Sequence, residues 1–128
     1  MGQFQVDAMV GVLVDACGWA SLVDAGINLD ISLGKVVGEA QLKVTRGVKE
    51  ELDRLSKTRS GLLLDLLYSR SEIVEFEDAH TDDSLLSISA EMSWPVLTVD
   101  KGLKSRLVSS GCSYIEVTSG PSLRLVGP

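Results

Sequence analysis

The sequence predicts an α/β domain in which a mostly parallel sheet is covered by helices on both faces. Short apolar segments that suit buried strands alternate along the chain with segments that have the apolar periodicity of helices. Val10–Val14 and Val96–Val99 are apolar at most positions, as expected of strands whose two faces are both covered. At 128 residues, with 45% hydrophobic and 23% charged residues, the chain suits a single soluble domain.

The first part of the chain contains a strand, a helix and a second strand. The strand Val10–Val14 leads into a short helix over Ala16–Ala25, which Gly26 ends. The stretch 27–40 is the least regular and receives no assignment, and the alternation of Gln41–Thr45 predicts the second strand.

Two helices are predicted in the middle of the chain. The first covers residues 46–60, with an apolar stripe of Val48, Leu52 and Leu55. The second begins behind Ser60 and is apolar nearly all round, with leucines at positions 62, 63, 64, 66 and 67. Because such a helix is either deeply buried or part of an interface, we expect a homodimer.

The second half continues the alternation of strands and helices. In order, we expect a strand over 72–77, a helix with Thr81 as its N-cap, a strand over Val96–Val99, a helix over Lys101–Ser109 stopped by Gly111, and a strand over Tyr114–Val117. The segment "SLRLVG" is either a short final strand or a tail.

Composition excludes several classes of function. The net charge of −6 argues against binding nucleic acid by bulk charge, and two Trp, two Tyr and two Phe are too few for base-stacking platforms. Cys17 and Cys112 are isolated thiols, as in a reduced cytosolic protein, and His80 is the only histidine, which argues against structural zinc. With neither a membrane span nor a signal peptide in the sequence, we expect a cytoplasmic protein without a membrane partner.

Two predicted strands are followed by an aspartate, a residue that is a poor strand former. Asp15 follows the first strand and Asp100 follows the strand that begins at Val96. Ligands of open parallel sheets bind outside the carboxyl ends of the strands, so we expect both carboxylates at the same edge.

Helix geometry places further acids near that edge. Glu51 falls about 40° from Leu55 at 100° per residue, at the border of the buried stripe. Asp82 and Asp83 lie in the first turn of their helix, where carboxylates complement the helix dipole.

A cluster of such acids would need a cation. Two carboxylates ~4 Å apart repel by ~4 kcal/mol at an effective dielectric of 20. Oxygen ligands without His or Cys suit Mg²⁺ or Mn²⁺, and such a site suits metal-assisted phosphodiester cleavage. Arg46, Lys101 and Lys104 are candidate contacts for RNA phosphates near this edge.

Each of these residues also has a purely structural explanation. Asp15 and Asp100 could simply cap the helices that follow them, and Glu51 could be an ordinary border residue of an amphipathic helix. Asp82 and Asp83 could be only helix N-terminal charges, and each basic residue could be a solvated surface group.

Four segments in this order resemble the PIN-domain ribonucleases. They are "VLVDACGW", "VTRGVKEELDRL", "TDDSLLSISAE" and "PVLTVDKGLKSRLVSSGCSYIEV", and the resemblance spans about residues 10 to 126 of a single domain at 1–128. The chain is most similar to small archaeal members related to the eukaryotic nucleolar nuclease of small-subunit rRNA processing.

The resemblance implies a parallel five-stranded α/β/α sandwich and a Mg²⁺- or Mn²⁺-dependent endoribonuclease. The metal-binding, catalytic acids would be Asp15, Glu51 and Asp100, with the third acid of the sequence at Asp83 or Asp82. Asp83 has the better spacing to Ala90, where the family has a small apolar residue, and Asp82 faces nearer the helix stripe, so both are retained. Thr98 matches a hydroxyl that the family often carries two residues before its last aspartate.

One departure from the family pattern leads to competing functional hypotheses. Ala16 and Cys17 stand where the family has Thr or Ser followed by Asn or Ser, side chains that help to orient the surroundings of the metal. The hypotheses are an rRNA-maturation endoribonuclease, a VapC-type toxin ribonuclease, and an inactive module that binds RNA or protein in ribosome assembly. A phosphate-accepting receiver domain ranks lower, because Glu116 and Val117 stand where such a domain would carry a lysine.

Overall fold

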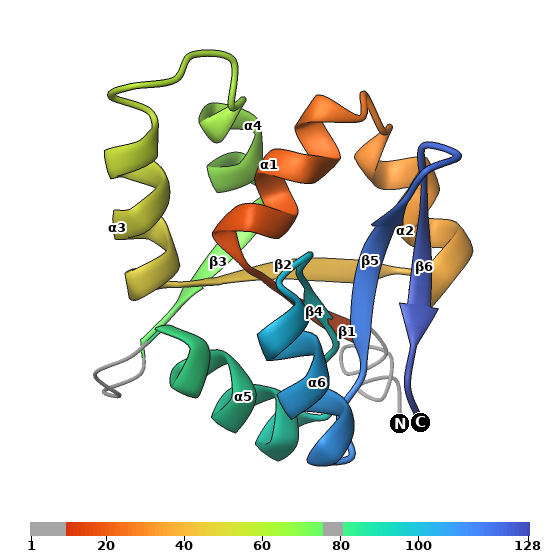
Figure 1. Cartoon of the computed structure of the whole chain (residues 1–128). Helices are drawn as coiled ribbons and strands as arrows, with labels where there is room; N and C mark the ends of the chain where they lie inside the picture. The colour runs from red at the N-terminus through yellow and green to blue at the C-terminus, as the bar shows by residue number, and fades with distance from the viewer. Residues whose placement is uncertain (1–9, 76–80) are drawn as a thin grey trace, which may run out of the picture.

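The computed structural model describes residues 10–75 and 81–128 (Figure 1). His80 and the last residues of the strand expected over 72–77 lie outside the described residues.

The described residues form one six-stranded sheet with the strand order β3-β2-β1-β4-β5-β6. The strands are β1 (Val10–Val14), β2 (Ala40–Thr45), β3 (Ser71–Val74), β4 (Val96–Leu97), β5 (Tyr114–Thr118) and β6 (Ser122–Val126). The first five pair in parallel and β6 runs antiparallel to β5. The α/β fold with a mostly parallel sheet is therefore confirmed, and "SLRLVG" supplies a sixth strand.

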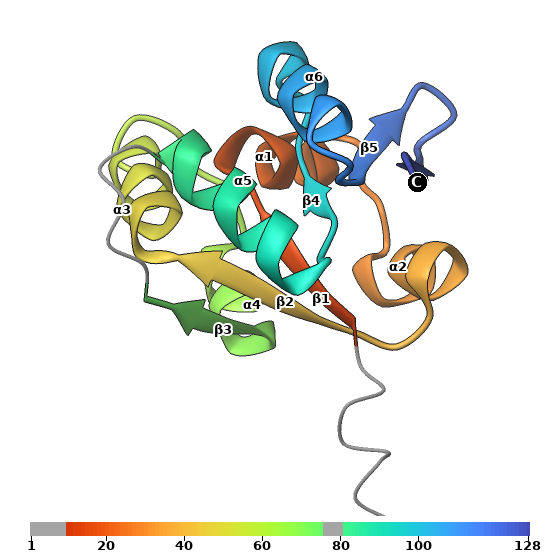
Figure 2. The ribbon, with the colours of Figure 1, turned by 90° about the horizontal axis from the view of Figure 1, so that it is seen from below.

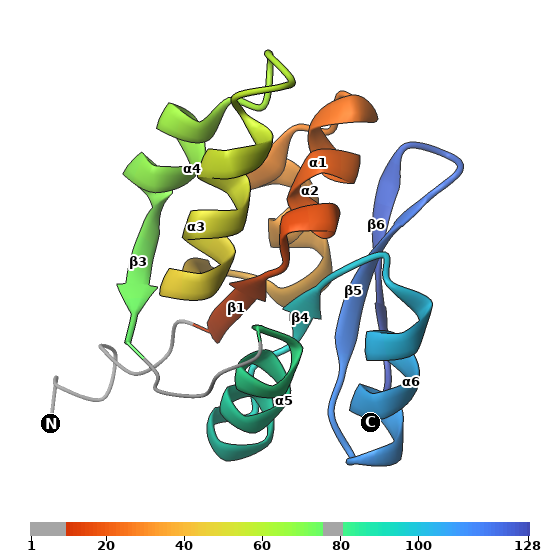
Figure 3. The same ribbon diagram turned by 60° about the vertical axis from the view of Figure 1, so that its left-hand side comes forward.

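Helices cover both faces of this sheet. They are α1 (Ala16–Asp24), α2 (Leu29–Val37), α3 (Arg46–Leu55), α4 (Leu64–Arg70), α5 (Thr81–Met92) and α6 (Lys101–Ser109). Figures 1 and 3 show α1, α3 and α4 on one side of the sheet and α5 and α6 on the other. Within the described residues, no helix combines the length and the apolarity that crossing a bilayer requires.

The two central strands are buried on both faces, which explains why their sequences do not alternate. Val12, Leu13 and Val14 of β1 and both residues of β4 have no exposed surface. The core continues into α1 through Trp19, whose indole Nε1 donates a hydrogen bond to the carbonyl oxygen of Leu62 at 2.7 Å. Because β1 and β4 pair in parallel, the residues that follow them lie at the same edge of the sheet.

The irregular stretch 27–40 contains a helix that periodicity did not reveal. The side chain of Asn28 accepts the backbone N–H of Ile31 at 3.0 Å and begins α2, and Gly38, with a φ of 75°, ends it. Only Leu29 and Leu33 of α2 are buried, so its apolar stripe is too narrow to stand out in the sequence.

The two middle helices are shorter than expected. α3 ends at Leu55 and not at residue 60. α4 begins at Leu64 and not behind Ser60, because Gly61 and Leu63 have φ values of 78° and 54° and cannot continue a right-handed helix. Thr81 is the first residue of α5, where we expected its N-cap.

The leucine-rich segment is buried on one side only. Leu62 and Leu67 lie in the interior, whereas Leu63 is 54% exposed and Leu66 is 37% exposed. The expected homodimer stays a prediction, with this exposed pair as its candidate contact.

Candidate active site at the carboxyl edge of the sheet

Asp15 lies directly behind β1 and is only 6% exposed. It is the N-cap of α1, and its Oδ1 accepts the backbone N–H of Ala16 at 2.9 Å. Its own N–H donates to the carbonyl oxygen of Leu97 in β4 at 3.0 Å, so the neighbouring strand positions its backbone. Capping is thus part of its role, but the same carboxylate also has partners beyond its helix.

Thr98 connects the two aspartates that follow strands. Its buried hydroxyl donates to Asp15 Oδ2 at 2.8 Å and accepts the backbone N–H of Asp100 at 3.1 Å. The sequence expectation that Asp15 and Asp100 share one edge of the sheet is therefore met by a direct chain of hydrogen bonds.

Asp100 is the N-cap of α6. Its Oδ1 accepts the N–H of Leu103 at 3.1 Å, and the residue is exposed. One carboxylate at this edge is therefore buried and one is open to solvent.

Glu51 and Asp82 lie near enough to this edge for its negative charge to affect them. Glu51 is an exposed residue, but partial desolvation of its carboxyl group raises its pKa, as do the charges of Asp15 and, more weakly, of Asp82, while Arg54 opposes the shift. Burial likewise raises the pKa of Asp82, with further increases from Asp15, Asp100 and, most weakly, Asp83, and an opposing effect of Arg106. Four elements of the fold thus bring negative charge to one place.

A glycine allows α3 and α5 to begin close together. A Cβ on Gly47, in the first turn of α3, would lie 2.8 Å from Thr81 Oγ1 at the start of α5. Figure 2 shows both helices beginning at the end toward which β2 and β3 point. This approach places Glu51 of α3 near Asp82 of α5, and the sequence pattern did not single out Gly47.

The comparisons with known proteins agree with this geometry. The family described as PIN like domain matches residues 12–119. The chain belongs to this family. Among solved structures, the PIN domain endonuclease Utp24 resembles it with a TM-score of 0.80 and 18% sequence identity, over 96% of each chain. At that identity the likeness shows a shared fold. A search of the curated proteins found no match.

The third acid of this PIN-like domain has two candidates with different surroundings. Asp82 interacts electrostatically with Asp15 and Asp100, as described above. Asp83 forms an ion pair with Arg106 of α6, with 2.7 Å between Oδ1 and Nη2. The structure therefore joins Asp82 to the other acids and ties Asp83 to the neighbouring helix.

The three basic candidates also differ in their surroundings. Arg46 pairs with Glu75, and Lys104 pairs with Glu116 at 2.8 Å and lies over the ring of Tyr114. Lys101 is exposed at the first position of α6, directly after Asp100. Of the three, Lys101 is the one that the described structure leaves beside the acids without an ion-pair partner.

Cys17, the departure from the family pattern, is part of the site. Its Sγ donates to Asp15 Oδ2 at 3.2 Å and lies 3.6 Å from Thr98 Oγ1. Burial and the charge of Asp15 raise the pKa of this thiol. The position therefore still carries a hydrogen-bond donor, a fact that the residue type alone did not reveal.

The donor set at this edge fits Mg²⁺ or Mn²⁺. Among the described residues, no group of three or more acidic, cysteine or histidine side chains is placed so as to hold a metal ion. Mg²⁺ does not need one, because it keeps several waters and uses few carboxylates. The pKa values of Glu51 and Asp82 are raised first by burial and then by the neighbouring negative charges, and a cation would offset the second contribution.

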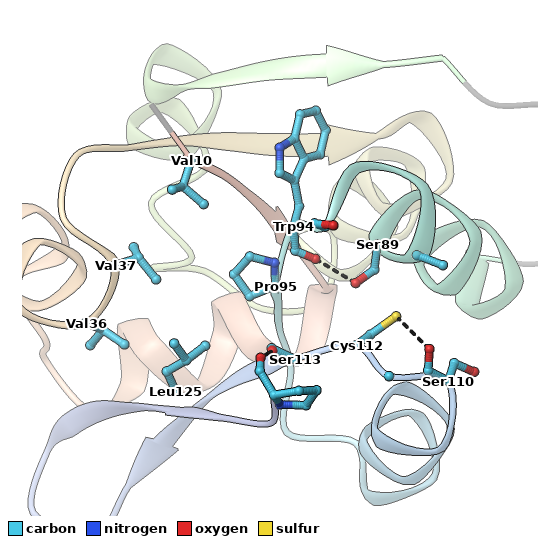
Figure 4. Close-up of a pocket in the computed structure, with 14 residues that line it drawn as sticks. Val10, Val36, Val37, Ser89, Trp94, Pro95, Ser110, Cys112, Ser113 and Leu125 are labelled. Carbon is cyan, nitrogen blue, oxygen red and sulfur yellow. Dashed lines mark hydrogen bonds between the residues drawn. The ribbon is translucent and has the colours of Figure 1, made fainter. Parts of the chain in front are cut away.

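A hollow elsewhere in the molecule lacks these features. It has a volume of about 540 Å³ and is lined by residues at the amino ends of the strands, among them Val10, Trp94, Pro95 and Cys112 (Figure 4). None of the described residues that line it is acidic. Its chemistry does not match that of the carboxyl edge.

The Thr98 link should make a measurable contribution to stability. Thr98→Val keeps the shape of the side chain and leaves the N–H of Asp100 without its acceptor, so we expect unfolding free energy to fall by about 1–3 kcal/mol. Urea denaturation without metal measures this loss. The matched change Thr58→Val, at an exposed threonine, should alter stability by no more than about 0.5 kcal/mol, and equal effects would contradict the link.

Proposed function

We propose that this PIN-like domain is a Mg²⁺- or Mn²⁺-dependent endoribonuclease. The observation that supports the proposal is the link between Asp15 and Asp100 through Thr98, with Glu51 and Asp82 near enough for the charge of Asp15 to raise their pKa values. The endonuclease activity named for Utp24, a structure with the same fold, supports it.

The four acids would hold the cation, and neighbouring parts of the fold support their positions. Thr98 and Cys17 orient Asp15, the cap at Leu103 orients Asp100, and the close approach at Gly47 brings the helices of Glu51 and Asp82 together. When bound, Mg²⁺ or Mn²⁺ would stabilise charge on the scissile phosphate and activate a water.

The protein's own cations would position the substrate. Lys101 is exposed beside Asp100 and suits a backbone phosphate. A shallow hollow of about 310 Å³, lined by Thr81, Asp82, Asp83 and Arg106, leaves room for substrate beside Asp82. RNA as substrate, and ribosomal precursor RNA as the first one to test, rest on the resemblance to rRNA-processing PIN nucleases.

A titration of Mn²⁺ into the wild type and Asp100→Asn tests the proposal. Asparagine is also a good N-cap, so the variant should keep its metal-free stability. We expect Mn²⁺ to raise the melting temperature of the wild type and to support cleavage of a structured precursor RNA. In Asp100→Asn we expect the thermal shift to shrink and cleavage to fall by about 100-fold or more.

Two results would count against the proposal. If neither protein responds to Mn²⁺ or Mg²⁺, the acids are capping residues or relics and an inactive assembly module is favoured. If both cleave RNA equally, the activity does not come from this edge of the sheet.

A further inference from the structure

The thiol of Cys17 makes a directed contact with a candidate metal ligand. Cys17 is the second residue of α1 and is partly buried. Its Sγ lies 3.2 Å from Asp15 Oδ2, within range for a thiol donor to a carboxylate. The hydroxyl of Thr98 donates to the same oxygen at 2.8 Å, so two side chains from α1 and the end of β4 converge on it.

The two carboxylate oxygens of Asp15 accept different numbers of hydrogen bonds. A carboxylate offers about four lone-pair positions, two on each oxygen. Oδ2 accepts from Cys17 and Thr98, and Oδ1 accepts from the N–H of Ala16. Hydrogen bonds within the described residues therefore fill Oδ2 and leave one position on Oδ1 for another partner.

Cys112, in contrast, has the surroundings of a cysteine that serves only packing. Cys112 is 6% exposed and belongs to the hydrophobic core, and its Sγ is 3.8 Å from the carbonyl oxygen of Ser110. That hydrogen-bond partner is a neutral backbone carbonyl. The environment of Cys17 differs because its contact is with a charged oxygen at the carboxyl edge.

We infer that Cys17 is a positioning residue, whose thiol, together with Thr98, holds Oδ2 of Asp15 so that Oδ1 stays available to a divalent cation. The inference rests on the proposed function. It gives Cys17 a role at the carboxyl edge through its contact with Asp15.

The test compares a conservative and a disruptive change in the full-length chain. Cys17→Ala removes the donor, Cys17→Ser keeps one, and Cys112→Ala controls for the loss of a thiol elsewhere. Calorimetric titration with Mn²⁺ should show affinity lowered about tenfold in Cys17→Ala, as for other residues that orient metal ligands. Cys17→Ser and Cys112→Ala should stay within about threefold of the wild type by the same comparison.

Packing alone predicts a different pattern. If Cys17 served only as a small apolar side chain, Cys17→Ala would bind Mn²⁺ with wild-type affinity. Cys17→Ser would then bind Mn²⁺ no better than Cys17→Ala. Either of those results would overturn the inference while leaving the proposed function intact, since the wild type would still bind the metal.

A measurement without metal tests the contact between Cys17 and Asp15 separately from the proposed nuclease function. Cys17→Ala should lower the unfolding free energy in the wild-type background, and this loss should disappear in an Asp15→Ala background, where the acceptor is absent. Equal losses in both backgrounds would overturn the contact with Asp15. A wild type that binds no Mn²⁺ would overturn the proposed function, and with it the metal-directed role of Cys17.

Discussion

Replacing Asp82 with asparagine is expected to lower metal-dependent RNA cleavage by about 100-fold or more, whereas the same change at Asp83 should leave cleavage within about threefold of the wild type. The two residues are adjacent in the first turn of α5, so the substitutions are matched in helix position and chemistry. Single-turnover cleavage of one RNA at saturating Mn²⁺ measures both.

The expectation follows from the charges around each carboxylate. Burial raises the pKa of Asp82, and so do the charges of Asp15 and Asp100, so a cation at this edge would favour its ionised form. Asp83 is engaged with Arg106 on α6, so its change should affect mainly the packing of α5 against α6.

Metal-free stability provides the control for this pair. Because Asp82→Asn removes repulsion at the acidic edge, it should leave the melting temperature without metal unchanged or slightly higher. A large fall would mean that the loss of cleavage reflects unfolding. If Asp83→Asn proved the more damaging variant, the alternative suggested by the spacing to Ala90 would hold, and Asp82 would be only a helix N-terminal charge.

The edge that carries the site could be predicted because it follows from the parallel direction of the strands, without knowledge of their order. Asp15 and Asp100 end two apolar segments, and parallel strands present their carboxyl ends together. Glu51 was identified from helix geometry, and the structure finds its carboxylate within reach of the charge of Asp15. Strand ends and helix periodicity are local properties that a sequence displays directly.

The individual hydrogen bonds and ion pairs of the site could not be predicted, because they join segments that are far apart in the chain. Thr98 and Asp15 are 83 residues apart, and only the pairing of β1 with β4 brings them together. Asp82 and Asp83 could not be distinguished from the sequence, because the difference depends on where α6 places Arg106. The helix α2 could not be recognised from periodicity, because its stripe is narrow and its only clear signals are the end residues Asn28 and Gly38.

Nothing in the sequence indicated the glycines that allow close packing. Among them, Gly18 is the one whose replacement by alanine should change stability most. A Cβ there would lie 2.3 Å from the carbonyl oxygen of Leu97, 2.7 Å from its carbonyl carbon and 3.0 Å from the Cα of Thr98. These are backbone atoms of β4 and its end, so no side-chain rotation can relieve the clash.

Gly18→Ala should therefore lower the unfolding free energy by about 3 kcal/mol or more, at the upper end of overpacking effects. To make room, α1 must move away from β4, which weakens the bond between the N–H of Asp15 and Leu97 and the contacts of Asp15 with Thr98. The thermal shift with Mn²⁺ should fall as well. Urea denaturation and the Mn²⁺ titration measure the two effects.

Gly34→Ala is the matched control for Gly18→Ala. Gly34 lies in α2, and a Cβ added there would meet no described atom within 4 Å beyond its chain neighbours and the backbone of its own helix. Alanine should therefore raise stability by about 0.5–1 kcal/mol through helix propensity alone. Both variants gain the same propensity, and the difference between their unfolding free energies therefore isolates the clash with β4. A Gly18→Ala protein as stable as Gly34→Ala would show that α1 does not pack this closely, and the link from Cys17 through Asp15 to Thr98 would lose its structural basis.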